Sequence, residues 1–220
     1  LFMSELNQQH DSLKDIHDIR QIMERSSRFI SLSGLSGIAA GICALAASWF
    51  AYDWITEYYY RYDYRKGYYG GFFQNLKLNL MGLAAGVLVI ALGLAYYFTW
   101  RRARHNKVAL WNLTSRKLMW NMLIPLVSGG IFILAMLNKN EWRFVAPACL
   151  IFYGLALVNA SKYTLSEIRY LGYFEIVLGL ISTQFVGYGL YFWAFGFGVL
   201  HIIYGMIMWW KYERKNPLSS

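Results

Sequence analysis

Long runs of uncharged, mostly apolar residues constrain the fold of this chain more than any other feature. Four of them contain 24, 23, 20 and 18 residues, at 29–52, 78–100, 118–137 and 144–161. Because about 20 apolar residues cross the hydrocarbon core of a bilayer as a helix, each run predicts one transmembrane helix. Hydrophobic residues make up 57% of the chain and charged residues only 15%, an excess that a soluble core of this size cannot bury. The pattern predicts an all-α membrane protein.

The last apolar run, 176–210, contains 35 uncharged residues. One helix of that length would measure about 52 Å, far more than the bilayer core. Two glycines in the segment 194–198 suit a tight reversal between two helices. The sequence therefore predicts a six-helix bundle followed by a cytoplasmic tail, 213–220, with helices at about 29–54, 77–100, 118–137, 144–163, 171–193 and 198–212.

Basic residues predict how this bundle is oriented. With both termini in the cytoplasm, the inner segments hold 15 Lys and Arg residues and the outer segments hold six. The positive-inside rule favours this N-in/C-in arrangement. A five-helix alternative would place Lys211, Arg214 and Lys215 outside and is disfavoured. The predicted topology is multi-pass, with Lys66 outside and Arg104 inside.

Two segments outside the predicted helices have a distinct character. The cytoplasmic segment 1–28 carries apolar residues at helical spacing, which predicts an amphipathic juxtamembrane helix over 11–28. The outer loop, 53–76, is rich in Tyr and Phe, and we expect it to pack against the outer membrane interface. The basic loop 101–117 is predicted to contact anionic lipid headgroups rather than nucleic acid.

Polar side chains inside the predicted helices are candidate ligand-binding groups, because such residues are costly in lipid. This candidate site consists of Asn121, Asn159, Lys162, Glu175 and Gln184. Lys162 and Glu175 lie on consecutive helices and are expected either to form a structural ion pair or to reach the headgroups. A solute or proton site is the alternative, and Gln184 is expected to hydrogen-bond between helices.

His201 is a candidate pH-sensitive group, predicted to lie towards the outer side of the membrane. It is the only histidine inside a predicted span, so haem ligation by two histidines is not predicted. Asp53 or Glu57, at the outer end of the first helix, is expected to reach it if those helices touch. A core histidine with satisfied hydrogen bonds is the alternative interpretation.

Small residues at four-residue spacing mark a helix-packing face on the first predicted helix. Ser33, Gly37 and Gly41 allow another helix to approach closely, either within the chain or in a homo-oligomer. The two cysteines, Cys43 and Cys149, are interpreted as small buried apolar residues. No nucleotide-binding, catalytic or metal-binding motif occurs in the sequence, so no catalytic residue, cofactor or metal is predicted.

These observations leave three hypotheses about function. The first is a non-catalytic membrane protein that acts as a sensor, a regulator or a subunit of a membrane complex. The second is a transporter of a small solute or ion that uses the polar residues of the inner half. The third is a membrane enzyme that acts on lipid through His201, Asp53 and Glu57. A water-filled cavity reaching Glu175 and Lys162 would favour transport, and a lipid-sized groove beside His201 would favour the enzyme.

The segments 22–41 and 159–163 also resemble a known group of proteins. Ile22-Met23-Glu24-Arg25-Ser26 and Asn159-Ala160-Ser161-Lys162-Tyr163 resemble sequences of uncharacterised multi-pass inner-membrane proteins of the Bacteroidota. The resemblance implies location in the inner membrane of a Gram-negative bacterium. It implies no activity and no functional residue.

Overall fold

The computed structural model describes residues 33–64, 70–105 and 110–214, with residues 61–64 and 70–73 described by their backbone only. Within these ranges the chain is helical and contains no strand. This confirms the predicted all-α class. The elements are α2 (Gly34–Tyr64), α3 (Gly70–His105), α4 (Leu113–Asn138), the short turn η1 (Trp142–Phe144), α5 (Val145–Ala160), α6 (Glu167–Ser182), α7 (Gly189–Trp193), the π-helical η2 (Ala194–Leu200) and α8 (His201–Tyr212).

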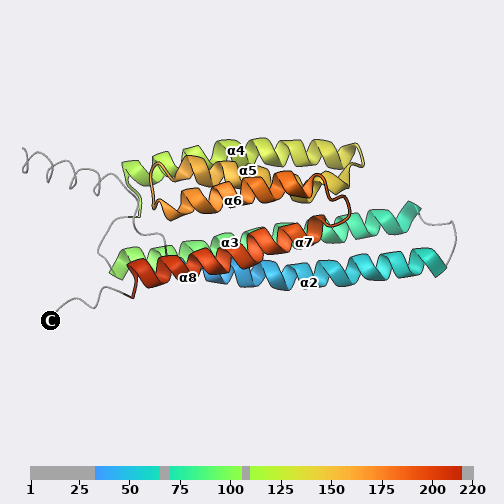
Figure 1. Ribbon diagram of the computed structural model, residues 1–220, viewed down its shortest axis with the longest axis horizontal. Coiled ribbons are helices and arrows are strands. Elements are labelled where there is room, and N and C mark those ends of the chain that lie inside the picture. Colours follow the sequence, from blue (N-terminus) through green and yellow to red (C-terminus); the bar gives the residue numbers. More distant parts are fainter. Residues whose placement is uncertain (1–32, 65–69, 106–109, 215–220) are drawn as a thin grey trace, which may run out of the picture.

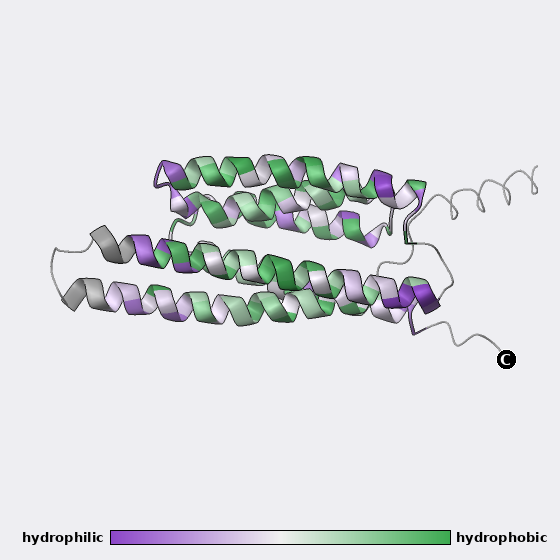
Figure 2. Cartoon of the chain, turned by 180° about the vertical axis from the view of Figure 1, so that it is seen from behind, coloured by the Kyte–Doolittle hydropathy of each residue, from purple (hydrophilic) through white to green (hydrophobic). Residues whose placement is uncertain are grey.

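The helices form two layers that lie side by side. One layer contains α4, α5 and α6, and the other contains α2, α3 and the continuous helix α7–η2–α8 (Figure 1). The first residues of α2, α4 and α6 lie at the same end of the bundle as the last residues of α3, α5 and α8. We call this the inner end. Hydrophilic residues gather near both ends, and hydrophobic residues run along the helices between them (Figure 2).

Within the described residues, five helices are long and apolar enough to cross a membrane. They are Gly34–Tyr60, Gln74–His105, Leu113–Asn138, Trp142–Ala160 and Gly189–Tyr212. The remaining long helix, α6, has 16 residues and measures about 24 Å, somewhat less than the bilayer core. The predicted amphipathic helix over 11–28 lies outside the described residues, as do residues 215–220 of the predicted tail.

The break in the last apolar run does not lie where the sequence analysis placed it. The predicted reversal at 194–198 is wrong, because these residues belong to one helix that runs from Gly189 to Tyr212. The chain instead turns at 183–188, where Gly187 has a φ of 96° that favours glycine. Gly196 and Gly198 serve packing rather than chain reversal, because side chains of neighbouring helices occupy the space where their Cβ atoms would lie.

The aromatic segment predicted as an outer loop is mostly helical. Helix α2 continues to Tyr64 and α3 begins at Gly70, so 53–64 and 70–76 extend the two helices. No glycine or proline interrupts the sequence between Gly41 and Gly67, which explains why the helix continues beyond the predicted boundary. This end of the α2–α3 pair projects beyond the layer of α4, α5 and α6 (Figure 1).

Glycines bring two pairs of helices into backbone contact. A Cβ atom on Gly41 would lie 2.7 Å from the carbonyl oxygen of Gly198, and one on Gly205 would lie 2.7 Å from that of Gly34. The predicted packing residues Gly37 and Gly41 therefore face the α7–η2–α8 helix of the same chain. Between α5 and α6, a Cβ atom on Gly154 would lie 2.6 Å from the carbonyl oxygen of Gly172. We call these two contacts the glycine seams.

The carboxylate of Glu213 joins three helices at the inner end. Its Oε1 accepts hydrogen bonds from the Ser33 hydroxyl at 3.1 Å, the Gly34 amide at 2.6 Å and the Arg102 guanidinium at 3.1 Å. Ser33, predicted as a packing residue, is buried and also donates one of these hydrogen bonds. Since the first amides of a helix lack partners within it, Glu213 acts as a remote cap for α2. It also holds the end of α3 against α2 and α8.

Candidate functional site

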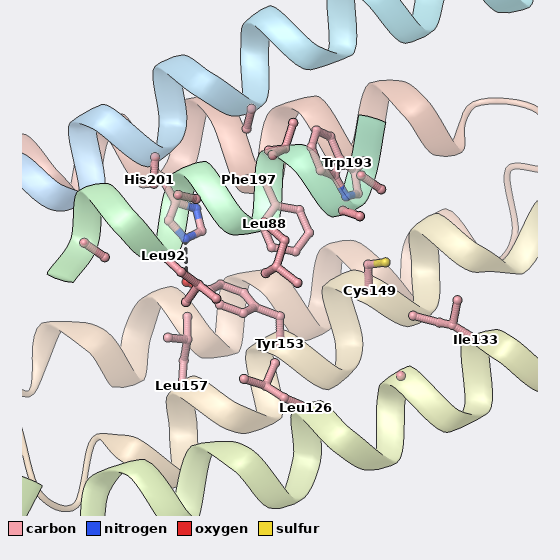
Figure 3. Close-up of a pocket in the computed structure, with 18 of the residues that line it drawn as sticks. Leu88, Leu92, Leu126, Ile133, Cys149, Tyr153, Leu157, Trp193, Phe197 and His201 are labelled. Carbon is pink, nitrogen blue, oxygen red and sulfur yellow. Dashed lines mark hydrogen bonds between the residues drawn. The ribbon is translucent and has the colours of Figure 1, made fainter. Parts of the chain in front are cut away.

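A groove of about 990 Å³ lies between the two layers. This volume is at the upper end of the range of about 300–1,000 Å³ that is usual for small-molecule sites. The lining is mainly aliphatic and aromatic, with Leu88 and Leu92 from α3 facing Leu126 and Ile133 from α4 (Figure 3). Helix α3 packs on α2 and α4 packs on α5, whereas α3 and α4 do not pack closely and are joined at one end by the hydrogen bond from Lys77 to Leu137. The groove therefore opens between them, on the side that would face lipid.

Tyr153 of α5 and His201 of α8 form a polar pair in the wall of the groove (Figure 3). The Tyr153 hydroxyl lies 2.8 Å from Nε2 of His201, and Nδ1 of His201 lies 3.0 Å from the carbonyl oxygen of Gly196. A carbonyl oxygen only accepts, so Nδ1 carries the proton. In the neutral ring, Nε2 then accepts the hydrogen bond from Tyr153. The pair joins the two layers, because α5 belongs to one and α8 to the other.

Glu175 lies behind His201, away from the groove. Its side chain is fully buried, and Oε1 lies 3.5 Å from Nδ1 of His201. Neither carboxyl oxygen has a hydrogen-bond partner. A Cβ atom on Gly196 would lie 2.6 Å from Oε2, so only glycine leaves room for this carboxyl group. Because a buried polar group without partners is costly, Glu175 is a strong candidate for a functional role.

Aromatic rings flank the polar pair. Phe197 stacks on the imidazole of His201 with ring centres 5.8 Å apart and an angle of 18° between the planes. It also contacts Tyr153 and Trp193, at 5.0 and 5.1 Å between ring centres. Sequence analysis missed Tyr153, Trp193 and Phe197. The signal for two of them was available, because Trp193, Phe197 and His201 recur every four residues and share one helix face.

The structure brings only one of the five predicted polar residues to His201, namely Glu175. Lys162 is exposed beyond the end of α5, more than two helical turns from the level at which Glu175 packs. Asn159 lies at the carboxyl end of α5, and neither it nor Lys162 lines the groove. Asn121 donates to the Lys117 carbonyl oxygen of its own helix at 2.8 Å. These residues therefore do not form one site.

Gln184 does not lie deep in a helix as predicted. It is exposed in the turn after α6, where its side chain donates to the hydroxyl of Thr183 at 3.1 Å. The displacement follows from the misplaced break, since α6 ends at Ser182.

Asp53 and Glu57 lie on α2, far from His201. Both are exposed, and the nearby Tyr52 contacts Tyr191. His201 lies ten residues further along its helix, which corresponds to about 15 Å. Its acidic neighbour is Glu175, from a helix that sequence analysis did not pair with it. His201 also lies near the middle of its helix rather than towards the outer side.

The two ends of the groove differ from its middle. At the outer end, Lys77 of α3 donates to the carbonyl oxygen of Leu137 of α4 at 2.8 Å and links the helices that border the opening. At the inner end, the lining includes Ser33, Ser36 and Thr164. Among the described lining residues, Lys77 is the one Lys, Arg, Asp or Glu. The groove thus suits a long, largely apolar molecule.

Comparison with known proteins adds no relative to this description. No family model, curated protein or solved structure matches the chain. Within the described ranges, no cluster of three His, Cys, Asp or Glu side chains has the geometry to hold a metal ion. The groove and the contacts that link Tyr153, His201 and Glu175 are therefore the features that bear on function.

Proposed function

We propose that this chain is a non-catalytic receptor for a lipid-like ligand in a bacterial inner membrane, where it acts as a sensor or as the regulatory subunit of a membrane complex. The observation that carries this proposal is the apolar groove, which is large enough for a long-chain molecule and open between α3 and α4. A ligand would enter from the bilayer without passing through water. The proposal includes six membrane-crossing helices with both termini in the cytoplasm.

Charge at the helix ends supports this topology. The inner end carries the basic residues Arg101, Arg102, Arg104, Arg116, Lys117, Lys162, Arg169, Lys211 and Arg214, whereas the described side chains at the outer end include Lys77, Lys139 and Arg143. This asymmetry agrees with the positive-inside rule. Exposed arginines and lysines at the inner end are suited to anionic headgroups. In this topology α6 also crosses the membrane and brings the number of crossings to six. The residues of the following turn span the part of the bilayer core that this short helix does not reach.

The position of the groove between layers provides a way to sense occupancy. Its walls come from α2, α3 and the α7–η2–α8 helix in one layer and from α4, α5 and α6 in the other. A ligand that binds more tightly to one spacing of the layers will shift the population towards that spacing. The Tyr153–His201 hydrogen bond, which also joins the layers, is the contact best placed to respond.

Photolabelling in lipid nanodiscs tests the proposal. With a phospholipid that carries a diazirine on its acyl chain, we expect adducts on Leu88, Leu92 and Leu126. Leu126→Trp fills the groove and should lower labelling of Leu88 and Leu92 by at least about fivefold. Val127→Trp is the matched control, because Val127 is 54% exposed on the same helix and does not line the groove. Labelling of the outer surface alone, or equal labelling in both variants, would refute a lipid-accessible groove.

A lipid-acting enzyme is the second candidate. The lipid-sized groove beside His201, with Glu175 at 3.5 Å from the imidazole, is the observation that favours it. We rank it second because the described lining residues include no cluster of His, Cys, Asp or Glu that could hold a metal ion, and both nitrogens of His201 already have partners. Conversion of a labelled lipid extract by the wild type, but not by His201→Gln, would reverse this ranking. Transport is less favoured, since Asn159, Lys162 and Glu175 do not line the groove.

A further inference from the structure

We infer that the ligand of the groove is an uncharged, long-chain molecule with a flat ring bearing carbonyl or hydroxyl groups, of the quinone class, whose ring binds against the aromatic cluster of Tyr153, Trp193 and Phe197. This inference rests on the proposed receptor function and specifies its ligand. Three independent observations support it: the depth of His201 in the membrane, the arrangement of the aromatic rings around it, and the hydrogen-bonding groups of Tyr153 and His201.

The depth of the polar pair sets the charge of the ligand. His201 lies 12 residues after Gly189 and 11 before Tyr212 in the last helix, so it is about 17 Å from either end. A bilayer core is about 30 Å thick, which places His201 and its partner Tyr153 near the midplane. A phosphate or carboxylate head group is strongly disfavoured at that depth. The polar part of the ligand that reaches the pair is therefore uncharged.

The aromatic groups favour a flat ring. Trp193 and Phe197 line the groove on the same helix face as His201, and Tyr153 faces them from α5 (Figure 3). A planar conjugated ring can stack on such side chains, whereas a saturated acyl chain gains nothing specific from them. The rest of the groove is aliphatic, with leucines of α3 and α4 along its length, and suits a long isoprenoid or alkyl tail.

The hydrogen-bond arrangement suits both a carbonyl and a hydroxyl group. With the proton on Nδ1 of His201, Tyr153 donates to Nε2 and its oxygen remains free to accept from a hydroxyl of the ligand. With the proton on Nε2, the imidazole donates to Tyr153, whose hydroxyl then donates to a carbonyl of the ligand. A quinone and its reduced quinol present these two groups at the same position on the ring.

Glu175 makes the second arrangement available. Moving the proton of His201 from Nδ1 to Nε2 leaves Nδ1 as an acceptor. The carboxyl group of Glu175 lies 3.5 Å from that nitrogen, and neither of its oxygens has another partner. A protonated Glu175 can therefore donate to Nδ1 once this nitrogen has no proton, and this contact replaces the hydrogen bond from Nδ1 to the Gly196 carbonyl oxygen. This gives the buried carboxyl group a role that packing alone does not explain.

Competition photolabelling of the full chain in nanodiscs tests the ligand class. The probe is an azidoquinone with a decyl tail, and we expect saturable adducts on the groove-lining parts of α5 and of the η2–α8 helix. Unlabelled decylquinone should displace the probe, whereas decanol and decane at equal concentration should not. Tyr153→Phe should weaken apparent affinity about fivefold or more, through loss of a hydrogen bond. Tyr173→Phe, an exposed tyrosine on α6, is the matched control and should not change it.

Two outcomes separate this inference from the proposed receptor function. Diazirine-lipid labelling of the groove that decylquinone does not reduce would overturn the quinone class and leave the receptor intact. Failure of both probes to label the groove would overturn both. Displacement by decanol as strong as by decylquinone would also overturn the ring assignment. This comparison uses wild-type protein, so it decides the matter even where Tyr153→Phe does not fold.

Discussion

The glycine seams and the outward face of α3, which lies away from the groove and which we call the open side, use the same small residue in opposite surroundings. In the seams, Gly154 and Gly172 allow backbones to touch, and an added methyl group would overlap a carbonyl oxygen. On the open side, a Cβ atom on Gly82, Gly86 or Gly93 of α3 would meet nothing within 4 Å. Close helix contacts in a membrane depend on such small residues, because lipid gives helices no hydrophobic reason to associate. The seams hold helices together within each layer, whereas the glycines of the open side pack against no other helix.

A glycine substitution in a seam should have the largest effect and would test this comparison directly. Gly154→Ala places a methyl group 2.6 Å from the Gly172 carbonyl oxygen, so α5 and α6 must separate. We expect a loss of about 2–3 kcal/mol in the free energy of unfolding, measured as a fall in thermal stability in detergent by size-exclusion chromatography.

The control for this substitution lies on the open side. Gly86→Ala adds the same methyl group where there is space, and alanine is favoured over glycine within a helix by about 0.5–1 kcal/mol. We expect unchanged or slightly higher stability. Equal destabilisation by both variants would show that α3 is packed as closely as the seams.

Removal of the Glu213 carboxylate should have an intermediate effect. Glu213→Ala removes the carboxylate that pairs with Arg102 and accepts from the Gly34 amide, and both side chains of that ion pair are largely buried, at 11% and 17% exposed. We expect a loss of about 1–3 kcal/mol, together with faster hydrogen exchange at the inner ends of α2 and α3. Glu141→Ala at the outer end removes a pair that is 50% and 39% exposed and should cost less than about 1 kcal/mol. A larger cost at Glu141 would contradict the role assigned to Glu213.

Acidification should have the smallest effect, through Glu167 at the start of α6. Partial burial raises the pKa of Glu167, but hydrogen bonds from Lys211 and Tyr212 outweigh it and hold the pKa below its usual value. A lowered pKa in the folded state contributes stability above about pH 4.3, and this is lost as the pH falls through the folded pKa. Thermal stability should therefore fall slightly more between pH 5 and pH 3 in the wild type than in Glu167→Gln. Parallel pH profiles of thermal stability in the two proteins would show that the hydrogen bonds of Glu167 with Lys211 and Tyr212 do not contribute to stability.

Most of the fold could be predicted from the sequence because membrane crossing requires length and hydrophobicity, which are local properties. The all-α class and the spans in α2, α3, α4 and α5 follow from them. The turn between α6 and α7 could not be placed in this way, because glycine serves both chain reversal and close packing. Only the neighbours of Gly196 and Gly198 show which role applies.

Less of the candidate site could be predicted, because it depends on which helices touch. Glu175 and His201 were recognised as polar residues in lipid, but on helices that the sequence did not place together. Tyr153 was missed because an aromatic residue in an apolar helix is unremarkable until its hydroxyl has a partner. The groove itself arises because α3 and α4 do not pack closely along most of their length, which no property of either sequence segment specifies.

The cap that Glu213 provides for α2 can form only at the end of synthesis. Glu213 follows Ser33 by 180 residues, so α2 leaves the ribosome and enters the membrane long before the group that completes its first turn exists. The same holds for the seam between α2 and α8, since Gly205 meets Gly34 only after the last helix has inserted. The earliest described helix is therefore held by the latest one. A nascent chain that stops before Glu213 lacks the carboxylate that accepts hydrogen bonds from Ser33 and from the Gly34 amide.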